Sequence, residues 1–251
     1  MNYLMSTYRA LCVGITGFAL TCSPSGAAAA GLNISPVVIE IDTARRAVAV
    51  TVSNLGTETV TFQTDTRVWR QVNGLDQFDA TDDLLVVPPI FRVEPNASQV
   101  FRVTLRQPQP SSTERTYRLL LEDISEVQRA DTGAAAVGFK FVHNLPVMVA
   151  PAGKVTAAAR WSPCASNPAV AKAEACVRVF NAGNRRVRVQ SLTVTGDGWQ
   201  QLVPVTDAVN LLAGAEREWR FLLPSGQTGA VRGVQVQTAR GETLQADAGG
   251  F

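Results

Sequence analysis

The chain has 251 residues, of which 46% are hydrophobic and 18% are charged, and its formal net charge at pH 7 is +2. The apolar fraction is that of a folded protein and excludes a chain that is disordered throughout. The near balance of charge argues against nucleic acid as a partner, and the single histidine excludes most metal sites and any mechanism that needs two imidazoles.

Residues 1–30 have the pattern of a secretory signal peptide. Arg9 is the only charge before the apolar segment Ala10–Leu20, and the small residues Gly26–Ala30 follow. This is the order of a charged region, an apolar region and a small-residue cleavage site. The expected cleavage positions are after Ala28 or Ala30.

The apolar segment of this signal is too short to span a bilayer, which needs about 20 apolar residues. A lipoprotein signal at Cys22 is the alternative, but Thr21 stands where a smaller residue normally precedes a lipidated cysteine. We therefore expect an exported chain with no stable membrane insertion.

The first half after the signal is β-patterned. Short alternating or apolar stretches recur between polar, Gly-, Pro- and Asn-rich turns, a spacing typical of antiparallel sandwiches. No stretch shows the i, i+3, i+4 pattern of a long helix. The expected strands are Val37–Ile41, Ala47–Ser53, Val60–Trp69, Gln99–Leu105, Tyr117–Glu122 and Val137–Val149.

A second β-patterned half begins after the Pro- and Gly-containing break Ala150–Lys154. Residues 31–150 hold 11 basic and 14 acidic side chains (net −3), whereas residues 151–251 hold 11 and 7 (net +4). Pattern and charge together predict two immunoglobulin-like β-sandwich domains, at residues 31–151 and 152–251, in an all-β protein. The strands expected in the second are Val155–Trp161, Ala175–Phe180, Val187–Val194, Glu216–Leu222 and Arg232–Thr238.

Four cysteines are present, and signal cleavage removes Cys12 and Cys22. The remaining pair, Cys164 and Cys176, flanks a polar stretch between two expected strands. In an exported protein this spacing predicts one structural disulfide that joins the arms of a hairpin. A zinc site is disfavoured because no histidine or further cysteine lies nearby, and a redox-active pair is more often C-x-x-C.

No convergent set of titratable side chains for catalysis is found. His143 is the only imidazole, and a strand histidine that packs or faces solvent is favoured over a general base at this position. The chain contains no G-x-S-x-G, no glycine-rich phosphate loop and no H-E-x-x-H. We therefore expect no enzyme activity, no metal and no cofactor.

Two charged groups are interpreted as surface features. The first group, which lacks the glycine and final glutamate of a calcium loop, is expected in an exposed loop and consists of Asp76, Asp79, Asp82 and Asp83. The second group, which lacks the interleaved aromatic residues of a nucleic-acid site, is expected at a solvated strand edge and consists of Arg185, Arg186 and Arg188.

The segment Val137–Val149 is longer than the usual strand of about 5–6 residues. One face carries apolar residues and His143, and the polar, Ala-rich stretch Ser125–Ala136 precedes it. A long apolar strand at a sheet edge invites aggregation unless another chain uses it, and strand addition is one known mode of recognition. A long strand in the core of the sandwich is the alternative, and the composition does not decide between the two.

Four stretches resemble, in this order, the periplasmic chaperones of the chaperone–usher pilus pathway: Val68–Asp83, Leu84–Val103, Glu114–Ile124 and Leu145–Pro151. Residues at the family's signature positions are Pro88, Pro89, Pro95, Gln99, Arg102, Arg115, Tyr117 and Arg118. The W-x-x-x-x-G-x-D pattern of Trp69, Gly74 and Asp76 resembles the archaic branch, typified by spore-coat-U and Csu-type pili.

This resemblance implies two immunoglobulin-like domains in an L-shaped arrangement, located in the periplasm. It also implies pilus subunits as partners, which lack a final strand, and transfer of each subunit to an outer-membrane usher. The chaperone lends its own edge strand, and aligning on Pro151 makes Val137, Phe139 and Phe141 the donor residues.

The better-known branch of this family anchors the subunit's C-terminal carboxylate with an arginine and a lysine, and this chain has Val38 and Pro146 at those places. Since a buried carboxylate needs a positive partner, we expect the anchor at Arg118, then Arg102, then Lys140. An arginine that pairs Glu122 or Asp123 is the alternative for Arg118.

Two other function classes are left open by the sequence. One is a secreted immunoglobulin-like binding or adhesion module that recognises its ligand through loops. The other is a hydrolase of unusual type that uses His143.

Overall fold

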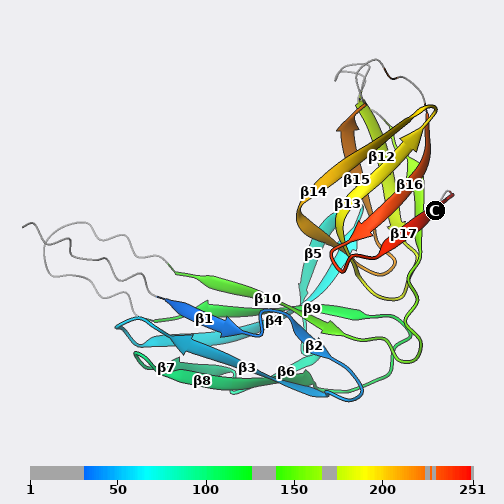
Figure 1. Ribbon diagram of the computed structural model, residues 1–251. Coiled ribbons are helices and arrows are strands. Elements are labelled where there is room, and N and C mark those ends of the chain that lie inside the picture. Colours follow the sequence, from blue (N-terminus) through cyan, green and yellow to red (C-terminus); the bar gives the residue numbers. More distant parts are fainter. Residues whose placement is uncertain (1–30, 126–139, 166–173, 224–226, 228–229, 250–251) are drawn as a thin grey trace, which may run out of the picture.

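The computed structural model describes residues 31–125, 140–165, 174–223, 227 and 230–249 (Figure 1). Within these residues every regular element is a strand, and no helix is long and apolar enough to cross a membrane. The strands form two bodies that meet at an angle in an L-shaped molecule (Figure 1).

Two sheets pack face to face in the first body. One has the order β1 (Leu32–Ser35), β3 (Ala47–Asn54), β8 (Ser98–Leu105) and β6 (Leu84–Val87). The other has the order β2 (Ile39–Ile41), β10 (Val142–Val149), β9 (Arg115–Asp123), β4 (Val60–Val72) and β5 (Leu75–Ala80), with β7 (Ile90–Val93) paired to β4.

Alternation of buried and exposed residues along most of these strands builds the core between the two sheets. In β9 the inward residues Tyr117, Leu119 and Leu121 are buried, whereas their neighbours are at least partly exposed. Each large apolar side chain buried in this way stabilises the fold by about 1.5–3 kcal/mol. The alternating pattern therefore determines which face of each strand points inward.

The second body is a seven-stranded sheet that closes around its own core. Its order is β14 (Trp199–Leu211), β13 (Val187–Gly196), β16 (Val231–Thr238), β17 (Thr243–Ala248), β11 (Ala159–Pro163), β12 (Glu174–Asn181) and β15 (Glu216–Leu222). Residues from both ends of this order, such as Leu192 and Trp219, pack into one apolar cluster. Both bodies are thus immunoglobulin-like β-sandwiches, as the sequence predicted.

The predicted disulfide is present. Cys164 and Cys176 are bonded, and the Cys164 backbone N–H donates to the Cys176 carbonyl at 3.2 Å. The bond joins the chain just after β11 to the start of β12, which are paired arms of a hairpin. Its role is therefore structural.

The sequence predicted that the acidic group Asp76, Asp79, Asp82 and Asp83 lies in one exposed loop. The structure instead divides these residues between a strand and the residues that follow it. Asp76 and Asp79 lie in β5, which continues the β4 hairpin through the turn Asn73–Gly74, where both residues have positive φ (52° and 76°). Asp79 pairs with an arginine of β4, and Asp83 accepts the Tyr117 hydroxyl at 2.9 Å. Burial, together with this bond, raises the pKa of Tyr117 to about 12. The carboxylates of Asp79 and Asp83 therefore have different partners.

Candidate functional site

Strand β10 has an open edge over its first half. On one side it pairs with β9 along its whole length, from Val142 to Val149. On the other side it pairs with β2 only through Val147–Val149. Among the described residues, no strand covers the segment from Val142 to Pro146 on that side.

Two hydrogen bonds show which backbone groups face this open edge. Asp123 N–H donates to the Phe141 carbonyl at 3.0 Å, and Ala150 N–H donates to the Ile41 carbonyl at 2.8 Å. Because hydrogen-bonding direction alternates along a strand, odd-numbered residues of β10 bond β9 and even-numbered residues face the β2 side. The backbone groups of Val142 and Asn144 are therefore directed toward the open edge.

The side chains alternate in the phase that the sequence predicted. Leu145, Val147 and Val149 are buried in the core, while Phe141, two positions before His143 on the same face, is 60% exposed. The predicted strand is shorter in its described part, since Lys140 and Phe141 precede β10 and are not in it. The other two expected donor residues, Val137 and Phe139, lie outside the described residues.

His143 sits at the start of this core face. Its ring packs edge-on against Phe62, with centroids 6.2 Å apart, and its Nε2 atom is buried without a hydrogen-bond partner in the described part of the chain. A general base needs a partner that orients it and a path to substrate. The packing supports the interpretation of His143 as a strand histidine.

Arg118 lies on the outer face of the same sheet, in register with Pro146 of β10. Its guanidinium carbon is 3.8 Å from the centre of the Trp69 ring and 5.8 Å from that of Phe78. A cation stacked on an indole in this way is held by the ring's negative face. Two aromatic side chains therefore fix the position of this charge.

Arg118 forms no salt bridge within the described residues, although the charge of Asp76 acts on it electrostatically. No carboxylate there lies within ion-pair distance, Glu122 and Asp123 included, and its buried Nε atom has no hydrogen-bond partner. The neighbouring Arg67, by contrast, is paired to Asp65 at 2.6 Å. Burial lowers the pKa of the Arg118 guanidinium from its usual value, but an arginine stays charged at any physiological pH.

The other two expected anchor residues lie elsewhere. Arg102 is in β8, between the buried residues Phe101 and Val103, so it points away from the core on the outer face of the opposite sheet. Lys140 is exposed and lies two residues before β10. The structure therefore places Arg118 and Arg102 on opposite faces of the first sandwich.

A groove of about 890 Å³ lies where the two bodies meet, beside β2 and β10. Val38 and Pro146, which stand where the resemblance implied charged anchors, both line it. The second body contributes four arginines to its wall: Arg185, Arg186, Arg188 and Arg240. The groove thus combines apolar and charged residues of the first body with arginines of the second.

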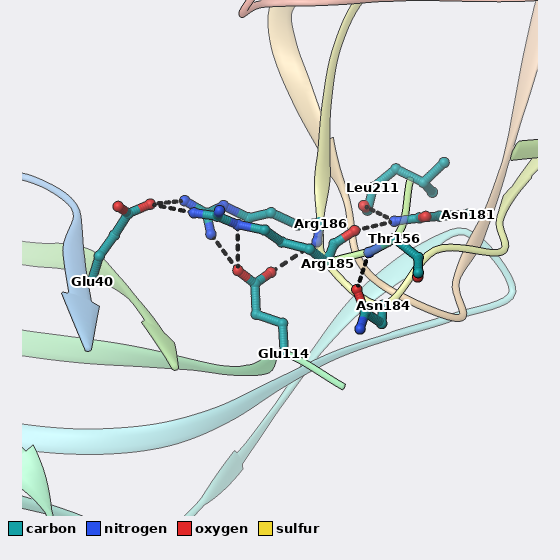
Figure 2. A network of polar contacts seen from close by, with 8 residues as sticks. All are labelled: Glu40, Glu114, Thr156, Asn181, Asn184, Arg185, Arg186 and Leu211. Carbon is teal, nitrogen blue, oxygen red and sulfur yellow. Dashed lines mark hydrogen bonds and ion pairs between the residues drawn. The ribbon is translucent and has the colours of Figure 1, made fainter. Parts of the chain in front are cut away.

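Two of these arginines form a partly buried ionic cluster between the bodies (Figure 2). The Arg186 guanidinium lies 2.6 Å from Glu114 and 2.6 Å from Glu40, and that of Arg185 lies 3.4 Å from each carboxylate. The side chain of Glu114 is only 1% exposed and that of Arg186 is 11% exposed. The expectation of a solvated strand edge is therefore wrong for both arginines, because acidic residues of the first body cover them.

Backbone contacts reinforce this junction. Glu114 N–H donates to the Asn184 carbonyl at 2.8 Å, and Asn184 Nδ2 donates to the carbonyls of Ser112 and Lys154 at 3.0 Å. Thr156 N–H donates in turn to Asn184 Oδ1 at 2.8 Å (Figure 2). One asparagine thus ties together the first body, the connecting segment and the second body.

The structure thus has two immunoglobulin-like sandwiches in an L, with an open-edged strand beside the junction. Residues 31–154 match the family described as pili and flagellar-assembly chaperone, PapD N-terminal domain. This match covers the first body and the connecting segment up to Lys154, and it assigns these residues to a family of assembly chaperones. No curated protein sequence matches the chain.

Solved chaperones have the same fold along almost the whole chain. In the complex of CsuC with the tip adhesion subunit CsuE from archaic Csu pili of Acinetobacter baumannii, the matching chain has a TM-score of 0.64 and 16% identity, with 88% of this chain and 100% of that chain covered. A Salmonella enterica structure of SafA pilin with the SafB chaperone matches with a TM-score of 0.59 and 16% identity, over 87% and 97%. The Escherichia coli chaperone DraB matches with a TM-score of 0.57 and 18% identity, over 88% and 97%.

Proposed function

We propose that this protein is a periplasmic chaperone that completes the fold of a pilus subunit with its own edge strand and then delivers the subunit to the outer-membrane usher. The observation that carries the proposal is the open edge of β10, where Val142 and Asn144 direct backbone groups away from the sheet. Strand addition satisfies such groups with the backbone of a second chain.

The lent segment consists of the residues that precede and begin β10. Val137, Phe139 and Phe141 share the phase of the core-facing residues, and Phe141 is 60% exposed in the free protein. In a subunit that lacks its final strand, such side chains fill the exposed core. Each large apolar side chain buried in this way contributes about 1.5–3 kcal/mol, and the exchange needs no ATP.

Arg118 is the proposed anchor for the subunit's C-terminal carboxylate. It is the register neighbour of Pro146, it is fixed on Trp69, and it is free of ion pairs among the described residues. Lys140 is the second choice because it lies within the lent segment, between Phe139 and Phe141. Arg102, on the opposite sheet, is the third.

The same proposal assigns the segments of the chain. Residues 1–30 are a cleaved signal peptide, residues 31–151 the subunit-binding domain and residues 152–251 the second domain. Export to the periplasm supplies the oxidising compartment that the disulfide Cys164–Cys176 requires. N-terminal sequencing of the exported protein tests the cleavage position, expected after Ala28 or Ala30.

Co-expression with a pilus subunit encoded beside the chaperone tests the central claim. A stable 1:1 complex is expected in periplasmic extracts, and without the usher it should accumulate without surface pili. Arg118→Ala should abolish the complex while the free chaperone stays folded. Arg67→Ala is the matched control, because this neighbouring arginine is already paired to Asp65. A normal yield of complex from Arg118→Ala would remove Arg118 as the anchor.

A further inference from the structure

The residues of the W-x-x-x-x-G-x-D pattern meet on the hairpin of β4 and β5. Gln71 is opposite Asp76 in the register and Trp69 is opposite Phe78, so these four side chains share one face. Trp69 Nε1 donates to Asp76 Oδ1 at 2.9 Å. The Asn73–Gly74 turn sets this register, and the carboxylate thereby fixes the rotation of the indole ring.

The indole in turn holds the proposed anchor. The guanidinium of Arg118 stacks 3.8 Å from the Trp69 ring centre, and Trp69 itself is 2% exposed. A buried ring with its N–H bonded has one orientation, so the cation above it also has a fixed place. Asp76 holds the ring beneath Arg118 and also attracts the guanidinium by its charge, and the two make no hydrogen bond or ion pair with each other in the described structure.

Gln71 connects this unit to the second domain. Its Nε2 donates to Asp76 Oδ1 at 2.9 Å and to the Asn210 carbonyl at 2.8 Å, while its Oε1 accepts from Leu212 N–H at 2.9 Å. Both amide hydrogens and the carbonyl are thus used. The backbone of the second domain therefore fixes the same carboxylate oxygen that fixes the indole.

We propose that the β4–β5 hairpin is a positioning device: Asp76 and Trp69 set the place of Arg118, and Gln71 makes that place depend on how the second domain is docked. The inference rests on the role proposed above for Arg118. This role explains why Trp69, the Asn73–Gly74 turn and Asp76 occur together. The turn places Asp76 where its carboxylate accepts the indole N–H, and this hydrogen bond fixes the ring under Arg118. Asp76, Trp69 and Gln71 are positioning residues and make no contact with the subunit in this proposal.

NMR of the free chaperone tests the positioning directly. The Arg118 Nε–Hε signal, assigned by its loss in Arg118→Lys, is expected upfield of the other arginines because the indole ring shields it. Asp76→Ala should move it toward the other arginine signals and move the Trp69 Nε1–Hε1 signal as well. Asp76→Asn should leave both in place, because the amide oxygen still accepts both hydrogen bonds.

Asp79→Ala is the matched control. It removes a carboxylate from the same strand, but this carboxylate pairs with Arg70 and not with Trp69. An unmoved Arg118 signal in Asp76→Ala would overturn the inference. Equal shifts in Asp76→Asn and Asp76→Ala would also overturn it, because the loss of the charge, and not the loss of the hydrogen bond, would then cause the shift. Gln71→Ala should shift the same two signals and alter the relative domain orientation measured by residual dipolar couplings. No shift of either signal in Gln71→Ala would overturn the coupling to the second domain.

Subunit binding separates this inference from the proposed function. Asp76→Ala should accelerate dissociation of the co-expressed subunit about ten-fold, the size of one charge-assisted contact, whereas Asp76→Asn should dissociate at the rate of the parent. If Arg118→Ala binds normally, the anchor role fails, whereas the NMR result still decides the positioning. If Asp76→Ala weakens binding while the Arg118 signal stays in place, the action through Arg118 is wrong.

Discussion

Glu114 and Arg186 are joined twice across the domain junction: Arg186 Nη1 lies 2.6 Å from Glu114 Oε1, and Arg186 backbone N–H donates to Glu114 Oε2 at 2.9 Å. Glu114 immediately precedes β9, the strand that carries Arg118, and Arg186 immediately precedes β13 of the second domain. The bidentate contact therefore links the candidate site's own strand to the second domain.

Glu114→Gln is expected to destabilise the protein by about 1–3 kcal/mol, because it leaves Arg186 with only the partly exposed Glu40 as its counter-charge. Urea unfolding measures the loss, and small-angle scattering should show a wider distribution of domain angles. Glu122→Gln, an exposed position on the same strand, is the control and should stay within about 0.5 kcal/mol of the parent. An equal effect of both variants would show that the junction contributes nothing.

Glu40 makes the junction sensitive to acid. The hydrogen bond from Arg186 lowers the pKa of Glu40 below its usual 4.5. A carboxylate with a lowered folded-state pKa contributes stability that is present above about pH 4.5 and is lost as the pH falls through the folded value. The side chain is 40% exposed, so its contribution is small.

Glu40→Gln is therefore expected to lower the urea midpoint at pH 7, and its difference from the parent protein should shrink as the pH falls from 4.5 toward 3. Urea titrations of both proteins at steps between these pH values provide the comparison. A difference that persists unchanged at pH 3 would mean that the carboxylate's charge is not the cause.

The disulfide should stabilise the second domain. Its cysteines are 12 positions apart, and closing a loop of this size restricts the unfolded chain by about 3 kcal/mol. The double variant Cys164→Ser, Cys176→Ser should lower the calorimetric transition of the second domain by roughly 12–24 °C. A reductant added to the parent protein should do the same, and a transition unmoved by either treatment would contradict the prediction.

The sequence predicts strands well where one face is buried. The pattern at Ala47–Ser53 gives β3 to within one residue, since its alternate valines form core. Strand β5 is missed because all six of its residues are exposed, so it has no apolar face to reveal it. Its existence depends on the turn and on pairing with β4.

The site was only partly predictable for a different reason. Arg118 and the phase of β10 follow from local pattern and family resemblance, but the junction depends on contacts between distant residues. Arg186 is 146 positions from Glu40 and 72 from Glu114, so its local sequence resembles a solvated edge. Gln71 likewise meets Asn210 and Leu212 only after both domains have folded. Distances of this kind leave no periodic signal in the sequence.

The adjacent residues Phe141 and Val142 offer a direct test of strand lending. Both are exposed, at 60% and 55%, yet alternation places Phe141 on the core-facing side and Val142 on the other. Phe141→Asp should sharply reduce the yield of co-expressed subunit, because an aspartate buried in the subunit's groove lacks a partner. Phe139→Asp should act in the same way, whereas Val142→Asp, with an equal charge on the outward side, should retain most of the yield. Equal losses from Phe141→Asp and Val142→Asp would point to general disruption of the edge, and unchanged yield from both phenylalanine variants would rule out strand lending through this segment.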